Sequence, residues 1–417
     1  MLQYELRFPG NGEDMLNMLK LTYIITMTIA FTSNFMGANT NYYMRLSMGV
    51  FWIILWAIRS KGILKTNSFL RYLIFPWLCI FFLTLLLWMI NKPQIFDFSY
   101  VTRMCSNVLY CVVATLNAYI GIEFFGKDVL KLSFSSLLIS IGFNLISVWM
   151  TFGTSNVLEY MTSVLTANYQ YGSVMEAIAK NMEVQGATMA LGVYFVYYLF
   201  FNREEDTFHR LSPILLSLCG LYLGFKRVVV LGIVVVICIL WVMKYKKNNI
   251  RNIIMYAFIV FAILSFGYIV IAKTSYISLI AAYFNVDLMG RNNIYRTAAE
   301  LFEISPFYLG IGFGYAAKYL YDTTGFAVHS DIMRMYMELG FLPFIAWLWY
   351  YIYLIPQKVV TEFGTKFGRI CITITVFVFS TFLVENTLGL YPLHYALTLF
   401  TLLRLTVSED DDGYIEE

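Results

Sequence analysis

The sequence has little charge. Of its 417 residues only 13% are Asp, Glu, Lys or Arg, whereas 59% are apolar. Soluble domains carry about 25% charged residues and about 45–50% apolar ones. This balance excludes a soluble enzyme, a disordered chain and a fibrous repeat protein. A transmembrane β-barrel is also disfavoured, because its strands alternate in polarity and the apolar runs here do not.

Cysteine is scarce as well, and its six copies indicate neither a disulfide framework nor a metal site. Each cysteine lies inside or at the edge of an apolar run, and none shows the spacing of metal ligands. A cleavable signal peptide is not evident, since the first apolar run follows about 18 more polar residues and lacks a small-residue cleavage site. We interpret that run as a retained membrane span.

Apolar segments are what the sequence has in abundance. A membrane-spanning helix needs roughly 20 mostly apolar residues, and twelve runs approach that length. We therefore predict an all-α polytopic membrane protein with about 12 transmembrane helices. The runs are Leu19–Phe35, Leu46–Ile58, Leu70–Ile90, Met104–Phe125, Val129–Phe152, Ala187–Phe201, Leu211–Phe225, Val228–Met243, Ile253–Ala272, Phe341–Ile355, Ile370–Val384 and Leu388–Leu403.

The basic residues predict how these helices are oriented. With the N-terminus in the cytoplasm, 18 of the 29 Lys and Arg residues fall in inner segments and five in short outer segments. This is the bias that the positive-inside rule expects, so we read these residues as topology signals rather than as a nucleic-acid-binding surface. Both termini are then cytoplasmic. The two long loops are outside, where an activated substrate must arrive attached to a lipid because no nucleotide sugar is available.

These assignments divide the chain into four parts. Residues 1–272 hold the first nine transmembrane helices, with a first outer loop near 153–186. Residues 273–340 form the large outer loop, the only segment long enough for a small folded unit. Residues 341–404 hold the last three transmembrane helices, and residues 405–417 form a solvated acidic tail in the cytoplasm.

The large outer loop is predicted to contain an amphipathic helix. Arg291 and Tyr295 are four residues apart and share one face of this helix, with Arg296 beside them. Pro306 ends the helical pattern. The apolar residues recur at the spacing of a second face: Ile294, Ala298, Leu301 and Phe302.

A glycine-rich turn follows this helix. Gly310, Gly312 and Gly314 alternate with other residues, and no strand precedes them as a dinucleotide fingerprint would require. Two interpretations stay open. The turn lets backbone approach a ligand closely, or it is a hinge between the amphipathic helix and the membrane.

Two further signals flank this region. His329 lies near the membrane-proximal end of the loop, ahead of Arg334 and Glu338, which are spaced to form an ion pair. An imidazole can accept a proton near neutral pH, so His329 is either structural or a candidate general base. Lys226 and Arg227 lie at a tight outer hairpin, where they either reach lipid phosphates or bind an anionic headgroup. Weaker candidates are Glu385 with Asn386, and His394.

Four of these features, in this order, resemble the Wzy-type O-antigen polymerase and O-antigen ligase (WaaL) superfamily. The resemblance covers about Leu211 to Ile355. It implies a GT-C-type glycosyltransferase of the bacterial inner membrane that needs no metal or other cofactor. The features are Lys226–Arg227 at the hairpin, Gly290–Arg291 opening a helix, Pro306 followed by the three glycines, and His329 ahead of a helix ending in Glu338–Leu339–Gly340.

The resemblance also implies a reaction and its residues. A growing glycan would pass from undecaprenyl diphosphate to the sugar of an incoming lipid-linked repeat unit (polymerase) or to lipid A-core (ligase) at the periplasmic face. Arg227 and Arg291 would bind the diphosphate and stabilise it as it leaves. His329 would act as general base or orient the acceptor hydroxyl. The expected substrate-binding residues are Lys226, Tyr295, Arg296, Arg334 and Gly312.

We favour a polymerase over a ligase because a composition rich in Phe, Tyr, Ile and Asn is associated with polymerases of variable surface glycans. A flippase for lipid-linked sugars is the alternative from a different class. Transporters commonly place charges near the midplane and show two similar halves, whereas here the charges cluster in an outer loop. The expected partners are an undecaprenyl-diphosphate-linked oligosaccharide, the bilayer and, as a further candidate, a chain-length regulator.

Overall fold

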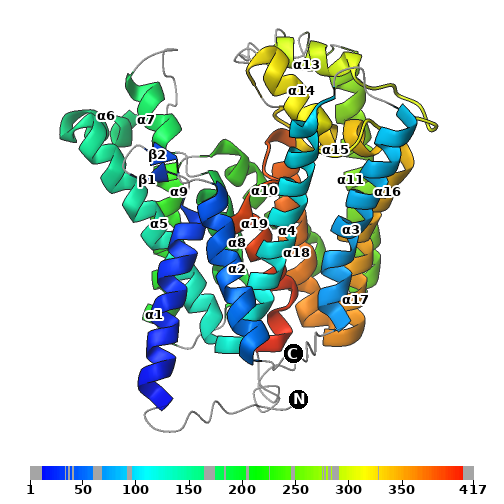
Figure 1. Ribbon diagram of the computed structural model, residues 1–417. Helices are drawn as coiled ribbons and strands as arrows, with labels where there is room; N and C mark the ends of the chain where they lie inside the picture. Colours follow the sequence, from blue (N-terminus) through cyan, green and yellow to red (C-terminus); the bar gives the residue numbers. More distant parts are fainter. Residues whose placement is uncertain are drawn as a thin grey trace.

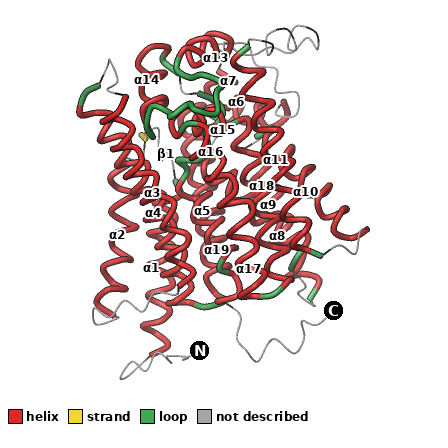
Figure 2. Tube along the Cα trace, turned by 90° about the vertical axis from the view of Figure 1, so that its right-hand side faces the viewer, coloured by secondary structure: helices red, strands yellow, loops and turns green. Residues whose placement is uncertain are grey.

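The computed structural model describes residues 12–32, 34–35, 38–39, 42–59, 68–91, 96–163, 174–182, 185–202, 206–224, 226–245, 249–274, 276, 279, 283, 291–326 and 328–406. Within these ranges the chain is helical apart from turns and one antiparallel pair of two-residue strands, β1 (Asn34–Phe35) and β2 (Ala38–Asn39). The helices lie roughly side by side in a bundle (Figures 1 and 2). This confirms the all-α polytopic class.

Each predicted apolar run of residues 1–272 overlaps a helix, although the first run, Leu19–Phe35, extends beyond the end of its helix at Phe31 into β1. Two short helices, α6 (Thr154–Ser163) and α7 (Val174–Met182), lie in the first predicted outer loop. The longer helices are α1 (Gly12–Phe31), α2 (Tyr42–Arg59), α3 (Ser68–Asn91), α4 (Phe98–Phe125), α5 (Asp128–Phe152), α8 (Gln185–Phe200), α9 (Thr207–Gly224), α10 (Arg227–Tyr245) and α11 (Ile250–Lys273).

The remaining elements form the large loop and the last helices. The loop contributes three short helices: α13 (Arg291–Glu300), α14 (Tyr315–Thr324) and α15 (Asp331–Leu339). The run Phe341–Ile355 becomes a longer helical rod, in which α16 (Phe341–Leu348) and α17 (Ile355–Phe363) are joined by a π-helical turn, η1 (Trp349–Leu354). The last elements are α18 (Thr365–Val384), α19 (Tyr391–Thr401) and a 3₁₀ turn, η2 (Leu403–Thr406).

Six of the described helices are long and apolar enough to cross a membrane by length and composition alone. They are α3, α4, α5, α10, α11 and α18. The other predicted spans are shorter, interrupted or less apolar as helices, so the total of about twelve stays a prediction. The start of α1 and η2, the last element described, lie at the same end of the bundle, and α13 and α14 lie at the opposite end (Figure 1).

Small residues let the central helices approach closely. An ideal Cβ on Gly232 of α10 would lie 2.9 Å from the ring of Phe377 on α18, so only glycine fits between these helices. Some polar groups in the core pair across helices. Trp52 of α2 donates its indole N–H to Thr26 Oγ1 of α1 at 2.8 Å.

Candidate functional site

The site is built where the start of α15 meets the connection between α18 and α19. The backbone N–H of Asp331 donates to the carbonyl of Glu385 at 3.2 Å. In return Asp331 Oδ2 accepts from the backbone N–H of Leu388 at 2.6 Å and from that of Thr387. Ser330 caps α15 by accepting from the N–H of Met333 at 3.2 Å. The buried Asp331 carboxyl therefore fixes the connection against the first turn of α15.

This contact places His329 opposite Glu385. The imidazole Nδ1 lies 3.7 Å from Glu385 Oε2, within the range of an ion pair but longer than a hydrogen bond. Both side chains are partly buried, and His329 Nδ1 has no hydrogen-bond partner within the described ranges. The arrangement is that of an imidazole with a carboxylate beside one of its two ring nitrogens.

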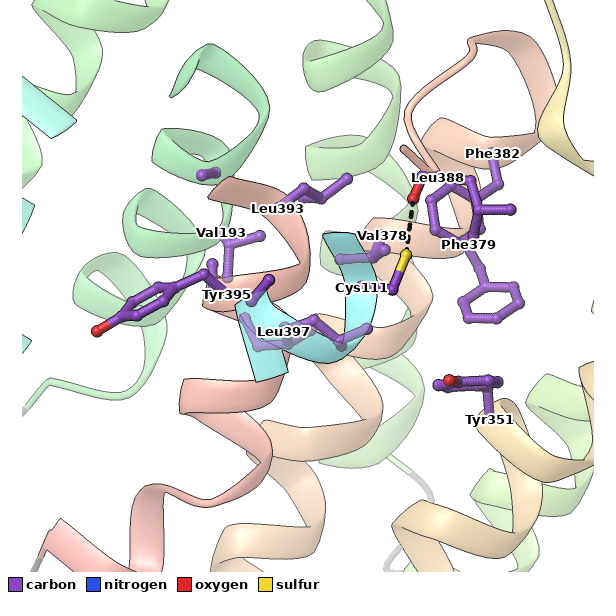
Figure 3. Packing of buried hydrophobic residues seen from close by; sticks show 14 of the residues in the cluster. Cys111, Val193, Tyr351, Val378, Phe379, Phe382, Leu388, Leu393, Tyr395 and Leu397 are labelled. Carbon is purple, nitrogen blue, oxygen red and sulfur yellow. Dashed lines mark hydrogen bonds between the residues drawn. The ribbon is translucent and has the colours of Figure 1, made fainter. Parts of the chain in front are cut away.

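The peptide of Leu388 links this site to the core. Its N–H is bound by Asp331, and its carbonyl accepts from His394 Nε2 of α19 at 2.5 Å. The thiol of Cys111 on α4 points at the same carbonyl from 3.7 Å (Figure 3). His394 Nε2 is therefore bound to the main chain of the connection that carries Glu385.

A buried charge cluster continues along α15. Arg334 Nε donates to Glu338 Oε2 at 3.1 Å, which confirms the predicted pair, and Arg334 Nη1 lies 3.9 Å from Asp331 Oδ1. The guanidinium also stacks over Phe313, 5.0 Å from the ring centre. Two polar atoms of the cluster, Arg334 Nη2 and Asp331 Oδ1, lack hydrogen-bond partners in the described part of the chain. Burial raises the pKa of Asp331 to about 7, although Arg334 opposes the shift.

The glycine turn is hydrogen-bonded to the end of α15, and its interpretation as a hinge stays a prediction. The N–H groups of Ile311 and Gly312 donate to the carbonyls of Met337 (3.0 Å) and Glu338 (2.8 Å), which satisfies the C-terminal carbonyls of the helix. Gly310 has φ of +83°, and a Cβ there would lie 2.4 Å from the backbone N of Gly340. Two segments of backbone are in contact here. The close approach that Gly310 allows is therefore to the backbone of this protein.

Gly312 also packs directly on α3. A Cβ at this position would lie 2.2 Å from Trp88 Nε1, and that indole donates to the carbonyl of Ile311 at 2.9 Å. The described contacts of Gly312 are thus with the protein, and its expected role in substrate binding stays a prediction.

Helix α13 is amphipathic as predicted, because Ile294, Ala298 and Phe302 are buried. Tyr295 is buried too, and its hydroxyl pairs with that of Tyr268 on α11 at 2.8 Å. Lys273 at the end of α11 caps α13 by donating to the carbonyls of Ala299 and, at 2.6 Å, Phe302. These contacts fix α13 on the end of α11.

The structure describes the side chain of only one of the two arginines expected to bind substrate from α13. Arg296 is exposed. Arg291 begins the helix, but its side chain lies outside the described residues, as does Gly290. The roles expected of Arg291, Tyr295 and Arg296 stay predictions.

Lys226 and Arg227 lie at the same end of the bundle as His329. Gly224, at the end of α9, faces Thr188 near the start of α8, and Gly186 of α8 faces Pro392 at the start of α19. This chain of contacts leads directly to the connection that carries Glu385. Lys226 is partly buried and Arg227 is exposed, at the first residue of α10. The predicted site residues on α10 and α15 therefore share one end of the molecule.

Sequence reasoning undervalued Glu385 and Asp331. From the sequence, Glu385 is a weak candidate. A carboxylate at the end of an apolar span costs free energy unless it has a partner, and this was a signal for Glu385. Asp331 gave no signal of its own, since its partners lie 56 and 57 positions away. Among the described residues, no group of three His, Cys, Asp or Glu side chains is placed to hold a metal ion.

Comparison with known proteins bears on this same region. Residues 213–348 match the family model described as O-antigen ligase. A comparison with curated proteins found no match. The matched segment begins within α9, ends with α16, and includes Arg227, α13, α14, α15 and His329, whereas Glu385 lies beyond it. The match over residues 213–348 therefore supports the O-antigen ligase and polymerase superfamily for this part of the chain.

Proposed function

We propose that this protein is a polysaccharide polymerase, for O-antigen or capsule, of the bacterial inner membrane. It would be a glycosyltransferase of the GT-C type with cytoplasmic termini. Its donor is a growing glycan on undecaprenyl diphosphate, and its acceptor is the sugar of an incoming lipid-linked repeat unit at the periplasmic face. The family match over residues 213–348 supports glycan transfer from a lipid carrier.

The observation that carries the proposal is the pair formed by His329 and Glu385. Its two facing atoms are 3.7 Å apart at the end of the bundle where α13 and α14 lie. A proton on Nδ1 would point at the Glu385 carboxylate and leave Nε2 as the proton acceptor. The carboxylate stabilises the imidazolium that forms when His329 takes up a second proton, as in other base and orienter pairs.

The reaction then balances without a further reactant. An acceptor hydroxyl of the repeat unit attacks the anomeric carbon of the donor sugar. The new glycosidic C–O bond forms as the bond between the anomeric carbon and the phosphate oxygen breaks, and undecaprenyl diphosphate leaves with the bonding electron pair. The hydroxyl proton passes to Nε2 of His329. General-base assistance of this kind contributes about 10²- to 10⁴-fold in rate.

Basic side chains would offset the charge that develops on the leaving diphosphate. Arg227 and Lys226 lie at the required end of the bundle, and Arg291 begins the helix of the large loop. Guanidinium groups clamp phosphate oxygens through paired donors, and fixed charge at a departing oxygen is usually the largest catalytic effect. Arg296 and Arg334 are the secondary candidates, and Arg334 Nη2 is buried without a hydrogen-bond partner in the described part of the chain.

A ligase is the second candidate, because the matching family model is described as O-antigen ligase. One experiment separates the cases: purified protein in nanodiscs is given synthetic undecaprenyl-diphosphate-linked repeat units, with and without lipid A-core. A ladder formed from repeat units alone supports the polymerase. Product found only on lipid A-core indicates the ligase. Movement of the substrate across reconstituted vesicles without chain growth would indicate a flippase and contradict both.

A further inference from the structure

The 304–309 segment, between α13 and α14, is fixed beside the ends of two membrane-spanning elements. The backbone N–H of Phe341, the first residue of α16, donates to the carbonyl of Tyr308 at 2.9 Å. On the other side, Asn91 at the end of α3 donates its side-chain amide to the carbonyl of Gly310. The segment therefore lies at the level where α3 ends and the α16 rod begins.

This segment exposes large apolar side chains at that level. Phe307 is 88% exposed and Leu309 is 53% exposed, and on the neighbouring first turn of α16 Leu342 is 68% exposed. Phe307 and Leu309 also line, together with Asn91, an open hollow of about 430 Å³. Contiguous exposed apolar side chains of this kind mark a surface that contacts lipid or another protein.

The surface of α3 favours lipid as the occupant. Exposed apolar residues recur along this spanning helix at helical spacing and reach its last turn, next to the 304–309 segment. A face of this kind on a membrane-spanning helix contacts acyl chains. The residues of this face are Phe75, Leu78, Phe82, Leu86 and Met89. The segment thus exposes apolar side chains beside the end of a helix that carries a lipid-facing surface.

We propose that the 304–309 segment inserts into the outer interface of the bilayer, with Phe307 at the boundary between headgroups and acyl chains. Aromatic side chains favour this depth. The segment is anchored on one side to the glycine turn and on the other to α16, both of which bind α15. The large loop, which carries His329, would then contact the bilayer directly through this segment, in addition to the contacts that the transmembrane helices make.

Spin labelling in nanodiscs tests this placement. The background replaces the four exposed cysteines, Cys79, Cys105, Cys219 and Cys238, with serine and keeps the two buried ones. Single cysteines then replace Phe307, Phe82 and Tyr321, and each is labelled with a nitroxide. Phe82 on α3 is the lipid-facing reference, and Tyr321 on α14 is the exposed reference from the large loop. Collision rates are measured with oxygen, which concentrates in the bilayer, and with a water-soluble nickel chelate.

We expect the label at Phe307→Cys to give an oxygen-to-nickel collision ratio several-fold above that of Tyr321→Cys but below that of Phe82→Cys, because Phe82 lies near the middle of α3 and Phe307 is proposed to lie at the interface. A ratio equal to that of Tyr321→Cys would place the segment in water and overturn the proposal. A label shielded from both reagents would also overturn it, because it would show a protein surface covering the segment. The measurement does not depend on catalytic activity, so its outcome is independent of the proposed function.

Discussion

His329 at the start of α15 and Glu385 at the end of α18 face each other, with Nδ1 and Oε2 3.7 Å apart. The two residues are 56 positions apart in the sequence, and a third residue brings them together. Asp331 binds the backbone of Thr387 and Leu388, so the connection that carries Glu385 cannot move away from α15 without losing these hydrogen bonds. The geometry of the proposed base therefore depends on a buried carboxyl that does not itself face the substrate.

Replacing Glu385 with glutamine should slow chain growth. The variant removes the charge next to His329 but keeps the side-chain size. Because a partly exposed ion pair contributes about 1 kcal/mol or less, we expect about a fivefold loss of turnover rather than complete inactivation. The matched control is Glu362→Gln, which removes the partner of Lys358 on α17. Equal rates for the two variants would exclude Glu385 as the residue that orients His329.

Arg227→Ala and Arg291→Ala should each abolish chain growth while the protein remains expressed and folded. Each change removes a basic residue that the proposed function assigns to binding of the diphosphate. Arg251→Ala serves as the control, since Arg251 is exposed near the start of α11, at the opposite end of that helix from Lys273. Ladder formation on lipid-linked repeat units is the measurement. Near-normal ladders from both variants would contradict their assignment.

Asp331 should make folding stability depend on pH. Its pKa is about 7 in the folded protein, against 3.8 for an ordinary aspartic acid, so between these values the folded state holds the proton more tightly. The free energy of unfolding should therefore rise as the pH falls from 7 to 4, by up to about 4 kcal/mol. The check is the Tm measured between pH 5 and pH 8, for wild type and Asp331→Asn. The variant should lose this increase, and parallel curves would show that Asp331 does not titrate in this range.

A glycine series should separate packing from backbone strain. Gly310→Ala should cost about 3 kcal/mol or more of unfolding free energy, because its Cβ would contact the backbone of Gly340 at 2.4 Å. Gly325→Ala also has positive φ but has open space, so about 1–2 kcal/mol is expected. Gly267→Ala lies in a helix with nothing nearby and should gain about 0.5–1 kcal/mol. Thermal unfolding in detergent gives the order, and equal losses at Gly310 and Gly325 would refute the packing contact.

The sequence predicts those parts of the fold that depend on local patterns. Apolar runs located the long helices because the hydrocarbon core selects for length and hydropathy. The buried face of α13 followed from helical periodicity, and Ile294, Ala298 and Phe302 are indeed buried. The pair between Arg334 and Glu338 followed from their spacing on one helix.

Long-range contacts could not be predicted in this way. The binding of Leu388 by Asp331 joins two loops that are far apart in the chain, and no local spacing signals it. The same holds for Gly310. The sequence predicted a flexible turn or a close approach to a ligand, whereas the structure shows Gly310 packed against the backbone of Gly340. The sequence shows where glycine allows an unusual backbone conformation. Which residue packs against that glycine depends on tertiary structure.

Glycan transfer with His329 as the base is tested most directly by comparing wild type and His329→Ala on a synthetic undecaprenyl-diphosphate-linked repeat unit. Binding of the lipid-linked substrate and the rate of chain growth are measured on the same nanodisc preparation. We expect binding within about twofold of wild type and a loss of turnover of about 10²- to 10⁴-fold. Wild-type ladders from His329→Ala, or a loss confined to binding, would contradict a catalytic role for this histidine.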